Sequence, residues 1–500
     1  MSAATAYERE MTKKVLWKLD CHILPPLALL WLANFIDRSN IGNARIAGLE
    51  RDANLHGNQF NVVLTVFYAS YLLIELPSNW ILKRMGPNRW LPIIVCVWGI
   101  VTTLTGLVHN FGGLLAIRIF LGFCEGGLLP GMVLYLSTLY KRHELQLRVG
   151  IFYASASLSG AFGGLLATAI SKMEGVGGLA GWRWIFILEG MATILLAGVA
   201  AIFLPETLAT AKFFTEEERT FAVQRFRSDH VAASVTDVLK ERSSPSLSEK
   251  QDESRLEETP QPFTPAPVDQ EEEQFEWREI KRGALSPSRE NHEALVDNLH
   301  FSGFLDIQTW LTGIAYFGLV VSLYSYSLFL PTIVSGLGYS GPEAQLRTVP
   351  PYVPATVITV VVAFLSDRLR WRGPFILICL PIAIAGYILA IVATTNTARY
   401  AAVFLMATGV YPSGPCILSI LPNNSSGHFK KATTTALQLA IANCGGFVAT
   451  FAYTQGMIAQ LDIRSTTSPL TPDQAPKYIK GHSIALAFLC LAWVLIAANV

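Results

Sequence analysis

Ionisable side chains inside long apolar stretches are the residues of this sequence that could do chemistry. Asp37 and Arg38 are neighbours in one such stretch, and Arg118 and Glu125 lie in another. A charged group at membrane depth costs about 2.5–3.5 kcal/mol on insertion scales, so each of these needs a reason to be there. Desolvation favours the neutral form of a carboxyl group, which can then exchange a proton near neutral pH. An arginine stays charged and can hold a carboxylate through two parallel hydrogen bonds.

Helical spacing indicates which of these groups can share a cavity wall. Seven residues are nearly two turns, which places Arg118 and Glu125 on one helix face, about 10 Å apart. Asp37 and Arg38 are adjacent and point about 100° apart, so one can face a cavity while the other pairs sideways. The alternative is a set of structural salt bridges that hold the two helices together.

Other polar residues in apolar stretches could extend such a site. Glu75 lies two residues before Pro77 and could join a proton relay, or it could hydrogen-bond the backbone that the proline frees. Asn443 is the best pocket candidate because a central asparagine should not face lipid. Tyrosines in membrane helices more often serve packing or the interface. The remaining pocket candidates are Tyr68, Tyr153, Tyr324, Tyr352, Tyr411 and Gln438.

The composition indicates which elements must position these groups. Hydrophobic residues make up 51% of the chain and charged residues 15%, and the mean hydropathy is +0.39. This is more apolar material than a soluble protein of 500 residues needs. Runs long enough to cross a bilayer form two sets, so we expect an all-α membrane protein with about twelve transmembrane helices in two six-helix bundles. The runs lie near residues 21–37, 60–82, 90–108, 112–138, 149–171, 184–204, 307–330, 348–366, 374–393, 400–421, 433–456 and 482–500.

The chain divides into four parts. Residues 1–20 are a polar N-terminal segment without a signal-peptide run, 21–204 and 306–500 are the two bundles, and 205–305 are a linker. Within the linker, Thr215 is the expected N-cap of a surface helix. Serine, proline, glutamate and glutamine dominate the part that follows, so we expect the linker to be largely disordered. Lysine and arginine concentrate in alternate loops, which predicts that both termini lie in the cytoplasm.

Two loop segments carry a family resemblance. Residues 79–86 and 363–370 resemble the two copies of a loop motif of the major facilitator superfamily, Gly-x-x-x-Asp-Arg-x-Gly-Arg. The second copy keeps its acid–base pair, whereas the first has lysine where aspartate is usual. The resemblance implies a gating role for Lys83, Arg84, Asp367 and Arg368.

Further motifs narrow the resemblance. Residues 37–45, 118–131, 181–190 and 423–427 are together similar to the anion:cation symporter family, in its fungal allantoate and nicotinate permease branch. Members such as the bacterial galactonate transporter carry the same acid–arginine pairs. By resemblance, Arg38 receives the substrate carboxylate, Asp37 and Glu125 couple protons, and Arg118 tunes or pairs with an acid. Glu75 could join the proton-coupling set.

The resemblance implies a proton-coupled symporter that imports a small organic carboxylate, such as nicotinate or allantoate, by alternating access. The expected binding residues are Arg38, Arg118, Tyr153, Tyr324, Gln438 and Asn443. The aromatic candidates favour a flat aromatic acid. We expect a monomer in the lipid bilayer, with the plasma membrane as the family's usual location and the proton as coupling ion in place of any cofactor.

Two other functions remain open: a non-transporting nutrient sensor on a transporter fold, and a facilitator or exporter of small molecules. A net charge of +1 gives no field for nucleic acid. No nucleophile–base set, phosphate-cradling loop or zinc-type cysteine spacing is apparent, so we do not expect an enzyme.

Overall fold

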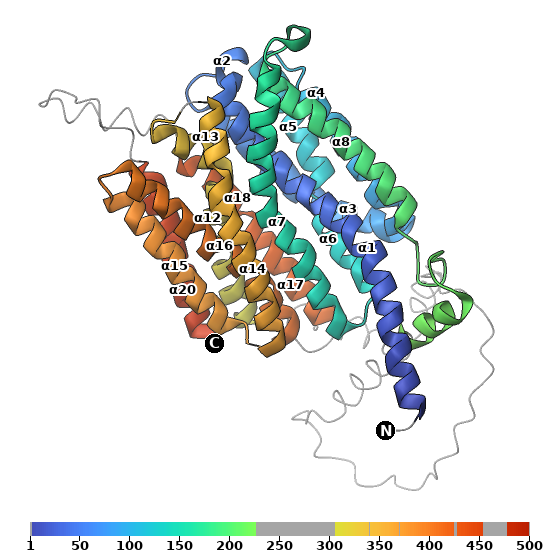
Figure 1. The fold of residues 1–500 in the computed structure, drawn as a ribbon. Coiled ribbons are helices and arrows are strands. Elements are labelled where there is room, and N and C mark those ends of the chain that lie inside the picture. Colours follow the sequence, from blue (N-terminus) through green and yellow to red (C-terminus); the bar gives the residue numbers. More distant parts are fainter. Residues whose placement is uncertain are drawn as a thin grey trace, which may run out of the picture.

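Long helices that run side by side make up the protein (Figure 1). The computed structural model describes residues 3–226, 306–339, 341–369, 371–424, 428–453 and 478–499. Within these ranges every regular element is a helix, and ten helical stretches are long and apolar enough to cross a membrane. Helices α3 and α7, of 27 and 29 residues, occupy the two other positions where a span is predicted. The prediction of an all-α membrane protein is confirmed.

The N-terminal half contains seven helices of ten or more residues, and the first begins earlier than the sequence suggests. Helix α1 is continuous from Ala3 to Ala44, so the polar N-terminal segment prolongs the first span. A short π-helix (Arg45–Leu49) and α2 (Glu50–Asp52) follow it. The others are α3 (Gln59–Met85), α4 (Pro87–Thr105), α5 (Phe111–Glu125), α6 (Leu128–Ser137), α7 (Arg142–Ile170) and α8 (Gly181–Phe203).

The C-terminal half is built around α12 (Ile307–Gly336), most of whose residues are buried. This helix packs against α1 of the other half as well as against its own neighbours. The remaining helices are α13 (Gly341–Arg347), α14 (Val349–Leu369), α15 (Gly373–Val392), α16 (Asn396–Asn424), α17 (His428–Asn443), α18 (Gly445–Ala452) and α20 (Ile479–Asn499).

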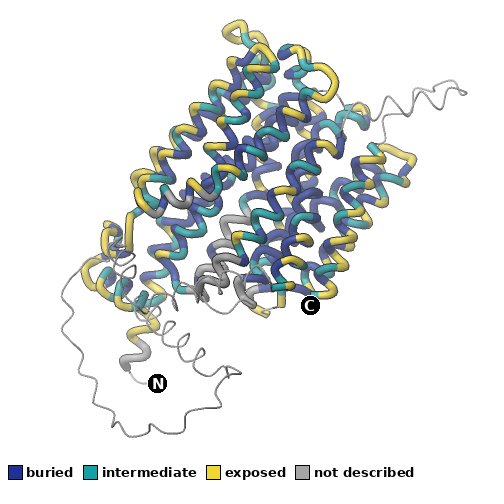
Figure 2. Tube along the Cα trace, turned by 180° about the vertical axis from the view of Figure 1, so that it is seen from behind, coloured by how far each residue is buried: buried dark blue, intermediate teal, exposed yellow. Residues whose placement is uncertain are grey.

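The outer faces of the helices are apolar. Large hydrophobic side chains such as Leu195 and Ile202 on α8, and Ile378 and Val392 on α15, are exposed. Figure 2 shows that exposed positions recur along the outer helices of the bundle. Contiguous apolar surface of this extent is unfavourable in water but is what a lipid environment solvates.

The fourth predicted span is interrupted where the sequence suggests one helix over 112–138. The structure has α5 and α6, separated by a turn at Gly126 and Gly127. Pro130 has no N–H to donate to the carbonyl four residues earlier, which belongs to Gly126. A Cβ on Gly126 would lie 2.4 Å from the Tyr71 carbonyl oxygen, so the glycine also lets α3 approach closely. The interruption leaves Glu125 as the last residue of α5.

The two halves touch near the end of the bundle that lies away from both chain termini (Figure 1). We call this the distal end. The Asn61 side chain donates to the Thr450 carbonyl, and the Thr65 and Thr450 hydroxyls are 2.7 Å apart. A Cβ on Gly42 of α1 would lie 2.3 Å from the Leu328 carbonyl oxygen of α12. The described residues of the two halves are therefore closely packed at the distal end.

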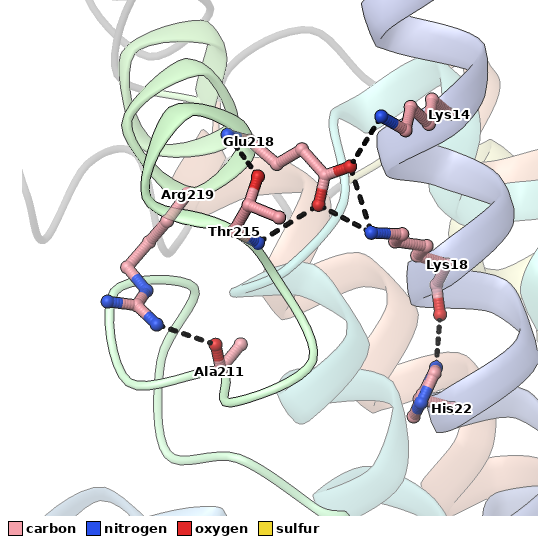
Figure 3. A network of polar contacts seen from close by, with 7 residues as sticks. All are labelled: Lys14, Lys18, His22, Ala211, Thr215, Glu218 and Arg219. Carbon is pink, nitrogen blue, oxygen red and sulfur yellow. Dashed lines mark hydrogen bonds and ion pairs between the residues drawn. The ribbon is translucent and has the colours of Figure 1, made fainter.

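The start of the predicted linker folds back onto α1 (Figure 3). Residues 216–226 are helical. Glu218 accepts hydrogen bonds from Lys18 at 2.7 and 2.9 Å, and Lys14 lies 3.1 Å away. The Thr215 N–H donates to the Glu218 carboxylate and the Glu218 N–H to the Thr215 hydroxyl, a capping box that confirms the predicted N-cap. The part predicted to be disordered, which follows this helix, lies outside the described residues.

Candidate functional site

A buried ion pair joins α1 to α5. Arg38 Nε donates to Glu125 Oε2 at 3.2 Å, and Asn34 Nδ2 donates to the same oxygen at 2.7 Å. Asn34 and Arg38 are four residues apart, so both lie on one face of α1. None of the three side chains is more than 6% exposed. Glu125 Oε1, also buried, has no hydrogen-bond partner among the described residues.

Aromatic rings surround the Arg38 guanidinium. Its Nη1 donates to the Tyr324 hydroxyl of α12 at 2.9 Å, which carries the contact across to the C-terminal half. The guanidinium carbon lies 5.0 Å from the centroid of Tyr71 and 5.5 Å from that of Tyr324. Phe35 and Phe67 are each 5.6 Å away. Stacking on ring faces compensates part of the hydration that a buried cation loses.

Asp37 points to a different helix from its neighbour Arg38. Its Oδ2 accepts a hydrogen bond from Trp98 Nε1 at 2.7 Å and one from the Thr102 hydroxyl at 3.1 Å, both on α4. Its Oδ1 is buried and has no partner in the described part of the chain. Asp37 therefore has both a fixed orientation and unused acceptor capacity.

Arg118 is the second buried cation of the site. Its side chain is 3% exposed, and its charge interacts with those of Asp37 and Glu125. Among the described residues, however, neither Nε nor Nη2 has a hydrogen-bond acceptor. The resemblance implies that Arg118 tunes or pairs with an acid; among the described residues, the hydrogen-bonded ion pair with Glu125 is made by Arg38. Buried donors without acceptors are unfavourable, so an added anion would be stabilised here.

An enclosed cavity lies next to this cluster, between the two halves. Phe35 belongs both to its wall and to the ring set around Arg38. The N-terminal half contributes side chains from α1 and α7, and the C-terminal half from α12, α14 and α16. The wall is mainly apolar and aromatic with a few hydroxyl groups. Its residues are Phe35, Ala156, Ser157, Tyr316, Leu319, Leu323, Thr359, Tyr411 and Gly414.

Two more predicted residues meet across the halves. Asn443 Nδ2 donates to Glu75 Oε2 at 3.4 Å. Asn443 is buried and Glu75 half-buried, and the eleventh predicted span is interrupted at Cys444, directly after the asparagine. The sequence offers two interpretations of Glu75, and this contact adds a third: Glu75 links the two halves. Gln438 lies within the C-terminal half, where its Nε2 donates to the Ile417 carbonyl at 3.2 Å.

The remaining predicted residues divide into three groups. Tyr68 is near the site, with its ring 5.2 Å from that of Tyr324, and Tyr352 packs 5.7 Å from Tyr411. Arg84 and Arg368 are exposed. The side chains of the third group lie outside the described part of the chain. The gating role of Lys83 and Asp367 and the pocket role of Tyr153 therefore stay predictions.

The sequence interpretation missed several partners. Trp98 and Thr102 hold Asp37, and the Asn40 side chain donates to Glu189 of α8. One signal was available: Asn34, Asp37 and Asn40 recur every third residue along the first span. The pairing of these residues with other helices depends on packing. Across the described ranges, no group of three or more potential ligands could hold a metal ion.

Comparison with known proteins agrees with this architecture. The sequence profile described as Major Facilitator Superfamily matches residues 27–450. An uncharacterized transporter of Schizosaccharomyces pombe is 36% identical over 97% of this chain and 82% of its own length. The high-affinity nicotinic acid transporter of Saccharomyces cerevisiae is 30% identical over 96% of this chain and 75% of its own. A bacterial homologue of the human lysosomal transporter Spinster has a similar fold, with a TM-score of 0.60 at 16% identity over 96% of each chain.

Proposed function

The chain belongs to the major facilitator superfamily, and from this membership we propose that it is a proton-coupled symporter importing a small organic carboxylate by alternating access. The observation that carries the proposal is the buried Arg38–Glu125 pair at the boundary of the two halves, beside an aromatic cavity. Substrate in this superfamily architecture binds between the halves, and this is where the pair lies.

The charges of the cluster suggest how proton and anion are coupled. Asp37, Glu125, Arg38 and Arg118 together are neutral when all four are ionised. A proton on Glu125 weakens its hold on Arg38 and leaves one net positive charge in a buried site. One substrate carboxylate then restores neutrality and supplies acceptors for the guanidinium N–H groups. Protonation of Glu125 and binding of the substrate carboxylate each make the other more favourable, so that one proton accompanies one monocarboxylate.

A flat aromatic monocarboxylate such as nicotinate fits the site best. The cavity presents Phe35, Tyr316 and Tyr411, on which a ring can stack. The carboxylate would lie toward Arg38, with Arg118 as its second cation. The relative that transports nicotinic acid supports this choice and the placement in the fungal permease branch.

We place the protein in the plasma membrane as a monomer, with both termini in the cytoplasm. The concentration of lysine and arginine in loops on the side of the termini supports this orientation. On this assignment the distal end faces outward. Its close packing then corresponds to a state closed toward the outside.

Uptake of a panel of labelled carboxylates into transporter-deficient yeast, at pH 5 and pH 7.5, tests the proposal. Wild type should take up one member faster at pH 5, and Glu125→Gln should lose both the uptake and the effect of pH. Uptake that is equal at the two pH values would favour a facilitator. No uptake of any member by well-expressed protein would contradict transport and favour a sensor.

A further inference from the structure

A stripe of polar residues follows α1 toward the distal end. Asn34, Asp37, Asn40 and Asn43 recur at every third position, and each is at most 2% exposed. With a rise of about 1.5 Å per residue, successive members are about 4.5 Å apart along the axis. The stripe thus connects the level of the Arg38–Glu125 pair with the end of the helix. Four buried polar side chains in succession need partners, because an unpaired polar group in an apolar setting is unfavourable.

The partners of the stripe form a nearly continuous series. Asn34 bonds Glu125, and Asn40 bonds Glu189 of α8. Asn43 Nδ2 donates to Asn40 Oδ1 at 3.5 Å. At the outer end, the Asn43 carbonyl accepts a hydrogen bond from Gln345 at 3.4 Å, which belongs to the C-terminal half. The series therefore runs from the centre of the site to the distal contact between the halves.

Glu189 is the carboxylate of this series that lies nearest to the distal end. It lies eight residues after Gly181, the first residue of α8, which follows the connection from α7. Its charge interacts with those of Asp37 and Glu125. Those two side chains are 1% exposed, whereas that of Glu189 is partly exposed. Its Oε1 is buried without a partner among the described residues, and its Oε2 is held by a neutral amide.

A purely structural role would not require an acid at this position. Among the described residues, the only hydrogen-bond partner of Glu189 is the amide of Asn40, and a glutamine could accept that hydrogen bond without a buried negative charge. The charges that act on Glu189 are those of Asp37 on α1 and Glu125 on α5. On α8 itself, Arg183 is already bonded to the Gly106 carbonyl and to His109. From α4, the residues that lie against Gly190, the next residue of α8, are Gly99 and Thr103, which are neutral.

We propose that Glu189 is the entry carboxylate for the coupling proton, which it receives at the distal end and passes toward Asp37 and Glu125. Three carboxylates in mutual interaction are unfavourable when all are ionised, so a proton bound at one is shared with the others. This inference rests on the proposed function, because it assigns a route to the proton that the symport needs. Glu189 acts through Glu125 and does not touch the substrate.

Proteoliposomes with purified protein and labelled nicotinate as probe test the route. Uptake driven by an inward proton gradient requires net proton entry, whereas counterflow at equal pH exchanges substrate without it. For Glu189→Gln we expect gradient-driven uptake to fall by about tenfold or more while counterflow stays within about twofold of wild type. Glu189→Asp should retain gradient-driven uptake. Glu174→Gln is the matched control and should leave both rates unchanged, since within the described ranges this acid near the start of α8 accepts a hydrogen bond only from the Gly181 N–H.

Each other result contradicts the inference in a recognisable way. Equal loss of both rates in Glu189→Gln would mean that the residue only supports the fold. Normal rates in both assays would mean that protons bypass it. A wild type that shows counterflow but no response to the gradient would overturn proton coupling itself, and with it this route.

Discussion

Arg38 owes its position to single contacts with side chains from three other helices. Glu125 supplies the negative charge, Tyr324 a hydroxyl acceptor, and Tyr71 a ring face. The free energy of a buried guanidinium depends strongly on each acceptor, because its N–H groups cannot replace a lost acceptor with water. The contact with Tyr324 is of special interest, since it links the proposed proton site to the C-terminal half.

Tyr324→Phe should therefore weaken substrate binding while it preserves the ring contact. We expect the apparent KM to rise about tenfold, or about 1.4 kcal/mol, because one buried charged donor loses its acceptor. Initial uptake rates over a range of substrate concentrations measure this. Tyr326→Phe is the matched control on the same helix, where the hydroxyl makes only a 3.3 Å bond to the Val403 carbonyl. Equal effects of both substitutions would argue against a role of the Tyr324–Arg38 bond.

At the scale of helices, the interruption between α5 and α6 places Glu125 at the end of α5. Glycines at the interruption let α3 approach so closely that no side chain fits between them. Closer packing of this kind is how membrane helices gain contact without a hydrophobic driving force. The site thus depends on an element boundary that is formed by small residues.

Gly126→Ala should destabilise the fold. The new Cβ would lie 2.4 Å from the Tyr71 backbone oxygen, so α3 and α5 must move apart. We expect a loss of about 1–3 kcal/mol, detected as a lower apparent melting temperature in detergent. Gly198→Ala on α8 is the control, because its Cβ meets nothing within 4 Å. An unchanged melting temperature for Gly126→Ala would contradict the close approach.

The linker helix at residues 216–226 is expected to detach from α1 at low pH. Burial alone would raise the pKa of Glu218, but hydrogen bonds from Lys18, Thr215 and Lys14 outweigh it and lower that pKa from 4.5 to about 2. A carboxylate whose pKa is lowered by folding contributes stability above its unfolded pKa and loses it as the pH falls toward the folded value. The contribution is therefore complete above about pH 4.5 and decreases between about 4.5 and 2.

Melting temperatures of wild type and Glu218→Gln at a series of pH values measure this contribution. We expect wild type to be more stable at pH 7, by about 1–3 kcal/mol, and the difference to shrink at pH 3. Glu216→Gln is the control, since that side chain is exposed and bonds only Arg219 of its own helix. A difference that does not change with pH would show that the charge of Glu218 is not what holds the helix.

At the scale of the whole molecule, the two halves are in contact at the distal end, through α3 and α18 and through α1 and α12. Alternating access requires that this contact open once per transport cycle. Tyr68 packs where a Cβ on Gly446 would be, and the ring of Tyr352 does the same at Gly160. Bulky residues of one half thus fit against glycines of the other, which allows the surfaces to separate and meet again.

Locking the distal contact should stop transport. The Thr65 and Thr450 hydroxyls are 2.7 Å apart, which is within the range that a disulfide can bridge after small adjustments. We expect the double variant Thr65→Cys/Thr450→Cys to lose uptake on mild oxidation and to regain it with a reductant. Uptake by each single variant should not change on oxidation. Uptake by the fully oxidised double variant would contradict opening at this contact.

Much of the architecture follows from the linear sequence, and the errors have a physical cause. Apolar run lengths are set by bilayer thickness, so the spans are predicted closely without knowledge of packing. The interruption after Glu125 was missed because an apolar run with glycines and one proline is compatible with a continuous helix. The early start of α1 was missed because its polar residues are stabilised by the linker helix, through Glu218.

The sequence by itself determined the membrane-spanning class and the presence of buried acids and arginines, because local composition and helical period suffice for both. Only the tertiary structure decided that Arg38 makes the ion pair with Glu125, while Nε and Nη2 of Arg118 have no acceptor in the described part of the chain. It also brought Glu189 into contact with Asn40. These pairings join residues up to 149 positions apart, so they depend on how helices are rotated and packed, which no single helix encodes.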